Sequence, residues 1–146
     1  MGSTHHSFLG EWGKSQKWEG ARTREYNKKD DLVVIENWLI GKKEGAENFA
    51  LRYYEVAPHH STRKEHHAHD HGIIVAQGQA NAEVNGEIFP IKQGDVIYVA
   101  PNDEHVFRNS GDGIFAFFCI IPAKREKDGQ IVWAEGDYFD KDSAKE

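Results

Sequence analysis

The sequence lacks several features that mark common functional classes. It has one cysteine, Cys119, so no intramolecular disulfide is expected, and a reducing cytoplasm is the expected location. No run approaches the ~20 apolar residues of a membrane span, and no basic start followed by an apolar stretch indicates a secretory signal. The net charge of −6, without a basic run interleaved with aromatic residues, argues against nucleic-acid binding.

Motifs for several familiar chemistries are also missing. The sequence contains no glycine-rich phosphate loop, no Ser-His-Asp arrangement and no CxxC pair. Cys119 lies within the apolar run 114–121, so it is expected to be a buried core thiol. A candidate site must therefore come from other residue types.

Short apolar runs separated by Gly, Pro and Asn turns dominate the middle of the chain. Asn85-Gly86 is the strongest of the hairpin signals. The spacing predicts an all-β fold, a sandwich or barrel. The expected strands cover residues 32–35, 38–40, 49–56, 73–76, 80–84, 87–91, 96–99, 105–109 and 114–121.

The composition, with 38% hydrophobic residues, suits a single globular domain with two polar extensions. We expect an N-terminal arm at 1–30, a β-barrel at 31–122 and a C-terminal extension at 123–146 that has room for one short helix. Trp12 and Trp18 are the expected buried contacts of the arm, which either drapes over the domain or reaches a partner subunit.

Histidines carry the functional signal. Six of the nine lie between His59 and His71, and His105 begins a later strand-like run after a turn. Imidazole is the commonest metal ligand among side chains. Residues 65, 67, 69 and 71 would share one face of an extended strand, and a metal then needs a further ligand from a neighbouring strand. The other reading is a histidine-rich loop that collects metal without purpose.

Two spaced motifs resemble those of the small single-domain cupins, a family of jelly-roll β-barrels with a central metal. In the first, His71 stands seven residues before Gly78, with His67 and Glu65 four and six residues before His71. In the second, Gly94 and Pro101 precede His105, and Asn109 follows it. The resemblance covers roughly residues 33–122 and implies a metal-binding jelly-roll barrel.

The resemblance implies that Glu65, His67, His71 and His105 bind one divalent metal: Mn, Fe, Cu, Ni or Zn. The family commonly has histidine where this chain has Glu65, and glutamate where it has His71. Glu65 is therefore either a direct ligand or a base beside three histidines. His66 and Asp70 should face away from the site, while His69 is a pocket residue or a further ligand.

The resemblance also implies a small-molecule substrate inside the barrel. The leading expectation is a metal-dependent oxygenase, and no other catalytic residue is assigned. The alternatives are a metal-dependent isomerase or lyase acting on a sugar or keto acid, and a non-catalytic metal- or metabolite-binding protein. Small cupins commonly pair, so a homodimer is expected.

Overall fold

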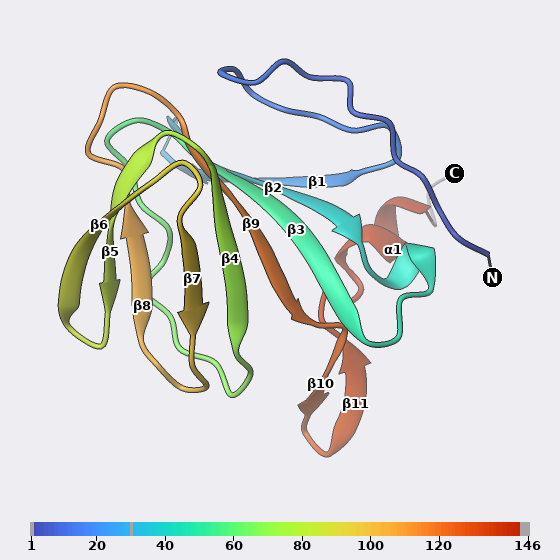
Figure 1. The fold of residues 1–146 in the computed structure, drawn as a ribbon. Helices are drawn as coiled ribbons and strands as arrows, with labels where there is room; N and C mark the ends of the chain where they lie inside the picture. The colour runs from blue at the N-terminus through green and yellow to red at the C-terminus, as the bar shows by residue number, and fades with distance from the viewer. Residues whose placement is uncertain (1, 30, 144–146) are drawn as a thin grey trace.

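A computed structural model describes the backbone of residues 2–29 and 31–143, and it is built almost entirely of β-strands (Figure 1). A six-stranded antiparallel sheet, in the order β1-β2-β3-β9-β4-β7, faces a three-stranded sheet in the order β6-β5-β8. A separate hairpin, β10-β11, and a short helix, α1, follow. The bounds are β1 Arg22–Lys28, β2 Asp31–Ile40, β3 Phe49–Val56, β4 His71–Gln77, β5 Gln79–Val84, β6 Glu87–Lys92, β7 Val96–Val99, β8 His105–Arg108, β9 Phe115–Pro122, β10 Lys124–Lys127, β11 Gln130–Trp133, the 3-10 turn Lys42–Glu44 and α1 Tyr138–Ser143.

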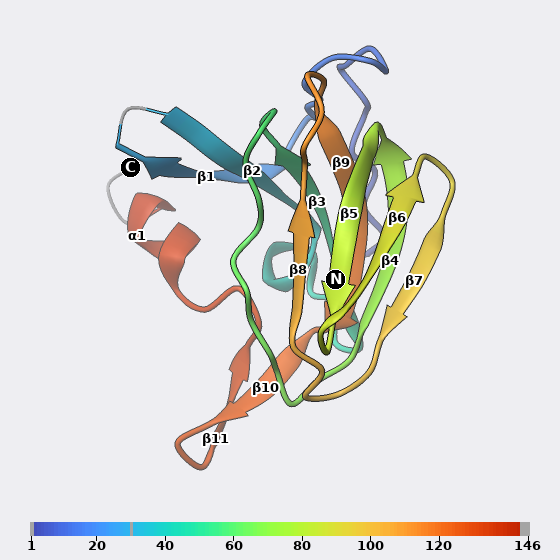
Figure 2. The same cartoon turned by 90° about the vertical axis from the view of Figure 1, so that its left-hand side faces the viewer.

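The two sheets curve toward each other with the core between them (Figure 2), which confirms the expected jelly-roll β fold. Alternation places Val56, Ile73, Phe107, Phe115 and Phe117 inside, each at most 4% exposed. The space between the sheets is therefore apolar, except where polar side chains gather at the candidate site.

The β5-β6 hairpin turns at Asn85-Gly86, as the sequence predicts. Both residues have positive φ, 50° and 82°, the backbone that a two-residue type I′ turn requires. At Gly78 both the backbone conformation and the lack of space exclude a side chain. Its φ is +72°, and a Cβ there would lie 2.2 Å from the Ile114 carbonyl oxygen.

Two features of the fold lie outside the sequence analysis. β1 adds a strand to the sheet within residues 1–30, pairing antiparallel with β2. Residues 61–65, although outside the named strands, run beside β8 through bridges from Ser61 to Arg108 and from Glu65 to His105. The histidine-rich segment is thus tied to the small sheet before it crosses to β4.

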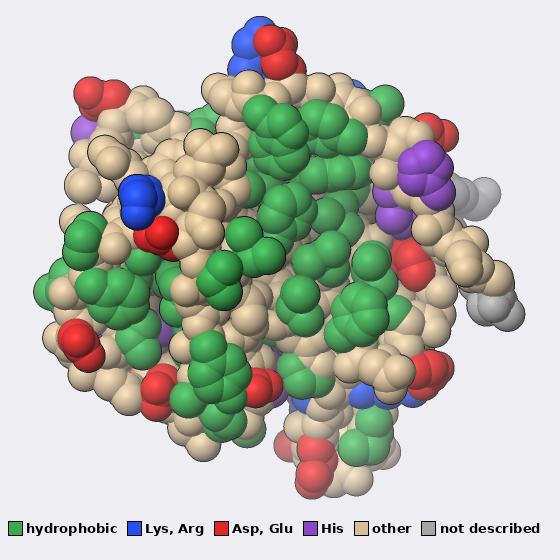
Figure 3. Space-filling model, in the orientation of Figure 1, with side chains coloured by type: hydrophobic (Ala, Val, Ile, Leu, Met, Phe, Trp, Pro, Cys, Tyr) green, Lys and Arg blue, Asp and Glu red, His purple; other side chains and the backbone are tan. Residues whose placement is uncertain are grey.

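The N-terminal segment covers part of the outer face of the large sheet, so the arm drapes over its own domain. The Trp18 ring lies 5.0 Å from that of Tyr53, and the Glu55 carboxylate accepts bonds of 2.6 Å from Ser15 Oγ and from Gln16 N–H. Trp12 is 51% exposed, so the expectation that it is buried is wrong. It stacks on Phe8, leaving one side of its ring uncovered. Hydrophobic side chains gather on this face (Figure 3).

In the described part of the chain, none of the helices has the length and apolar character needed to cross a membrane.

Candidate metal centre

Three imidazoles converge between the two sheets. His71 begins β4 in the large sheet, His105 begins β8 in the small sheet, and His67 lies in the connection between β3 and β4. One ring nitrogen from each lies within 4.8 Å of the others. The ring centroids of His71 and His105 are 4.9 Å apart, and those of His67 and His105 are 5.7 Å apart. Of the expected metal ligands, the fold thus brings these three together.

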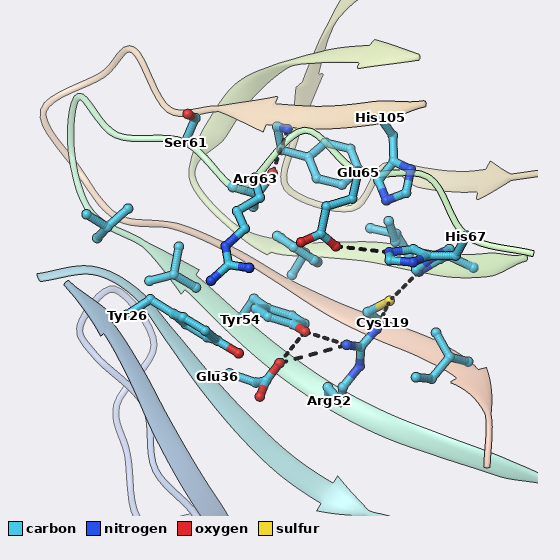
Figure 4. A pocket seen from close by; sticks show the side chains of 18 of the residues that line it. Tyr26, Glu36, Arg52, Tyr54, Ser61, Arg63, Glu65, His67, His105 and Cys119 are labelled. Atoms are coloured by element: carbon cyan, nitrogen blue, oxygen red, sulfur yellow. Dashed lines mark hydrogen bonds and ion pairs between the residues drawn. The ribbon is translucent and has the colours of Figure 1, made fainter. Parts of the chain in front are cut away.

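The fourth expected ligand, Glu65, sits at the edge of this cluster (Figure 4). Its carboxylate Oε2 lies 3.0 Å from Nε2 of His67, and its backbone pairs with His105 in both directions. Among the described residues, the group of mutually close ligand atoms holds only the three imidazoles. Glu65 therefore stays a predicted ligand, and its contact with His67 also suits a base beside the cluster.

The hydrogen bonds of the buried histidines leave ring nitrogens available as ligands. Nδ1 of His105 lies 2.9 Å from the Asp103 carbonyl oxygen, which can only accept, so Nδ1 carries the proton and Nε2 the lone pair. Nδ1 of His71 lies 3.4 Å from Cys119 Sγ, and its Nε2 is buried with no hydrogen-bond partner. A divalent metal would satisfy that orphan nitrogen, so the residues present fit such an ion.

Electrostatics keep the rings of His67 and His71 in the neutral form that binds metal. Burial, together with the positive charge of Arg52, lowers the pKa of His71 to about 3. Burial also lowers the pKa of His67. These two rings therefore stay uncharged without a metal at neutral pH, and protons compete weakly with a metal for their nitrogens.

The other polar residues of the histidine-rich segment have distinct places. His69 stacks on His67 with an interplanar angle of 3° and lines the cavity, in the position of a pocket residue. Burial lowers its pKa to about 4. His66 is exposed, and Asp70 accepts a 2.8 Å hydrogen bond from the Tyr98 hydroxyl. His59 is exposed and pairs with Asp112.

A buried polar network underlies the cluster, and the sequence analysis does not anticipate it. The Arg52 guanidinium donates to Cys119 Sγ at 3.1 Å and to the Tyr54 hydroxyl, and the Tyr54 hydroxyl donates to Glu36 (Figure 4). The Glu36 carboxylate also accepts from the Trp38 indole N–H at 2.7 Å. Burial raises the pKa of the Cys119 thiol, which stays protonated. The alternation of Arg52 and Tyr54 on one strand face is the sequence signal for this network.

The cluster opens onto a cavity of about 820 Å³. Phe107, Phe117, Ile73 and Ile121 form an apolar wall beside the histidines, while Tyr26 and Arg63 lie on another side. A volume of this size accommodates a small organic molecule. The arrangement offers a metal-binding group beside a chamber that has an apolar wall and, elsewhere, polar and charged lining residues.

Comparison with known proteins agrees with this architecture. A family model described as a cupin domain matches residues 52–121. A curated relative from Rhodospirillum rubrum, a 1-methylthio-D-xylulose 5-phosphate methylsulfurylase, is 31% identical over 77 residues. That match covers 53% of this chain and 49% of the relative, so the chain spans about half of the relative's length.

Two solved structures share the fold. A cupin-2 domain from Rhodospirillum rubrum superposes with a TM-score of 0.70 at 24% identity, covering 82% of this chain and 80% of the other. The polyketide cyclase RemF from Streptomyces resistomycificus gives a TM-score of 0.63 at 22% identity, covering 79% and 80%. The cupin-domain match and these structural neighbours support the assignment of the chain as a small protein of the cupin superfamily.

Proposed function

We propose that the chain is a metal-dependent enzyme that oxygenates a small organic substrate, with the metal held by Glu65, His67, His71 and His105. One observation carries the proposal. Three imidazole nitrogens lie within 4.8 Å of one another beside a cavity of about 820 Å³. Three imidazoles and a carboxylate suit Mn(II), Fe(II), Ni(II), Cu(II) or Zn(II).

A divalent metal bound there would supply open coordination positions for substrate and dioxygen. The residues of the chain supply the rest. His105 and His71 are oriented through their Nδ1 contacts, which hold each ring with Nε2 free. Phe107 and Phe117 exclude water from the side of the cavity next to the histidines. Glu65, if it is not a ligand, is placed to hold a proton at Oε2 beside His67.

Oxygen dependence tests the reaction class. The protein, loaded separately with Fe(II), Mn(II), Cu(II) or Zn(II), is incubated with a panel of small unsaturated and aromatic compounds and sugar phosphates, with and without air. The proposal expects substrate-dependent oxygen consumption with a redox-active metal and none with Zn(II). Turnover in anaerobic buffer with Zn(II) or Mg(II) would overturn it.

A second candidate is metal-assisted isomerase or lyase chemistry on a sugar or keto acid. It is favoured by the curated relative, whose name describes an enzyme acting on a sugar phosphate derivative. In this case the metal acts as a Lewis acid, with Glu65 as the base. Tight retention of a metabolite without turnover under any metal would instead indicate a non-catalytic binding protein.

We also propose that the protein is a cytoplasmic homodimer. The buried free thiol of Cys119 suits a reducing compartment. The outer face of the large sheet leaves apolar side chains exposed, including Ile74, Tyr98 and Ile120, which a second copy would cover. A sedimentation mass equal to that of one chain would contradict the dimer.

A further inference from the structure

Two neighbouring cations in the connection between β3 and β4 point to opposite sides. The bridges from Ser61 to Arg108 and from Glu65 to His105 hold residues 61–65 extended along β8, so alternate side chains face opposite ways. Lys64 faces outward, where its ammonium lies 3.2 Å from Glu83 and 3.5 Å from Glu104. Arg63, like Glu65, lines the cavity.

Arg63 lines the cavity although its side chain is solvent-exposed. Among the side chains that the structure describes, those of residues 2–29 and 33–140, no carboxylate pairs with Arg63, whose guanidinium carbon lies 5.6 Å from the centre of the Tyr26 ring. Figure 4 shows this guanidinium reaching into the cavity toward Tyr26. A guanidinium is a planar fork that binds carboxylate or phosphate oxygens in pairs. A guanidinium that lines a cavity and has no described anionic partner is therefore available to bind an anion.

The remaining charges of the cavity leave this position free. Glu36 is engaged by Tyr54 and Trp38, and Glu65 lies against His67. Glu25 is an opposing charge at the cavity lining, where Lys28 and Arg125 add positive charge. Although the chain carries a net charge of −6, the lining of its cavity thus includes Lys28 and Arg125 as well as Arg63.

We propose that Arg63, beside Tyr26, binds an anionic group of the substrate, either a carboxylate or a phosphate. The inference rests on the proposed function, because the anion belongs to the molecule that reacts in the same cavity. Arg63 and Glu65 are two residues apart in an extended segment, about 7 Å along the chain. The substrate therefore carries its anionic group a few atoms away from the part that meets the imidazole cluster.

The test measures anion binding by the 146-residue chain as isolated, by calorimetry at constant ionic strength, with inorganic phosphate and glutarate as probes. The variants are Arg63→Gln and, as a matched control from the next position, Lys64→Gln. Metal content is measured in each sample. Wild-type protein should bind at least one probe, and Arg63→Gln should weaken that binding at least about tenfold, which corresponds to about 1.4 kcal/mol. Lys64→Gln should change it less than about twofold, since its charge is already neutralised on the outside.

Each outcome decides something. Binding of phosphate alone or of glutarate alone identifies the group. Failure of wild-type protein to bind either probe overturns the inference, as does equal binding by Arg63→Gln or equal weakening in Lys64→Gln. Since anion binding and metal content are separate readouts, a wild-type protein that holds no metal would end the proposed function without hiding the result for Arg63.

Discussion

Lowering the pH from about 7 to about 5 should destabilise the metal-free protein through His71. Burial and the nearby Arg52 charge lower the pKa of this ring to about 3 in the folded protein, against about 6.5 for a histidine in an unfolded chain. As pH falls below 6.5, the unfolded chain takes up a proton at His71 that the folded protein refuses. The contribution of His71 to stability is therefore fully present above pH 6.5, and it is lost progressively as the pH falls from 6.5 toward 3.

The magnitude follows from the two pKa values. At about pH 5 the pH lies roughly 1.5 units below the pKa of this ring in the unfolded chain. Protonation therefore stabilises the unfolded state, and the folding free energy falls by about 2 kcal/mol. The ring is only 6% exposed, so little of this effect is screened by solvent. His69, whose pKa is lowered to about 4, adds to the same trend.

The assay is urea unfolding after chelation, at both pH values, for wild-type protein and His71→Gln. The variant cannot titrate at this position, so its stability should fall by about 2 kcal/mol less than that of wild type between the two pH values. Subtracting the pH-dependent change of the variant from that of wild type cancels the contribution of the other titrating groups. Equal pH dependence in the two proteins would refute the reasoning, because His71 would then titrate alike in the folded and unfolded states.

Three further predictions concern stability and metal affinity. Gly78→Ala should lower the free energy of unfolding by more than about 2 kcal/mol in urea titrations, whereas Gly86→Ala, with similar φ but no neighbour within 4 Å, should cost about 1 kcal/mol. Cys119→Val should lower metal affinity about 10- to 100-fold by removing the partner of His71 Nδ1, while Cys119→Ser should retain most of it in competition with a chromophoric chelator. Glu36→Gln should destabilise the protein by about 3 kcal/mol in thermal unfolding, because it leaves a buried guanidinium without its counter-charge; equal stability would contradict this.

The sequence predicts most strands well because their apolar runs end at turn residues. The expected strand 49–56 is β3 itself, and the run 96–99 is β7. The run 32–40 was expected as two strands and is the single strand β2. Glu36 and Asn37, two buried polar residues between Ile35 and Trp38, interrupt the hydrophobic pattern without interrupting the backbone pairing.

The convergence of His67, His71 and His105 is predictable from the two motifs. They place His71 and His105 at the starts of β4 and β8, and His67 four residues before β4. The network beneath these histidines is not predictable in this way. Arg52 opposes Cys119 across β3 and β9, although the two residues are 67 positions apart in the sequence, and only the register of the strands brings the pair under His71. Sequence alternation alone leaves Arg52 equally suited to the surface, since it does not reveal which face of β3 is buried.

The most direct test of the central claim is elemental analysis of the untagged protein beside three variants. His105→Ala removes a cluster imidazole, Glu65→Gln removes the carboxylate, and His66→Ala removes an exposed histidine of the same segment as a control. The account predicts about one divalent metal per chain in wild type and His66→Ala, and its loss in His105→Ala; loss in Glu65→Gln would make that residue a ligand. No metal in wild type after reconstitution, or equal metal in His105→Ala, would contradict a metal centre between the sheets.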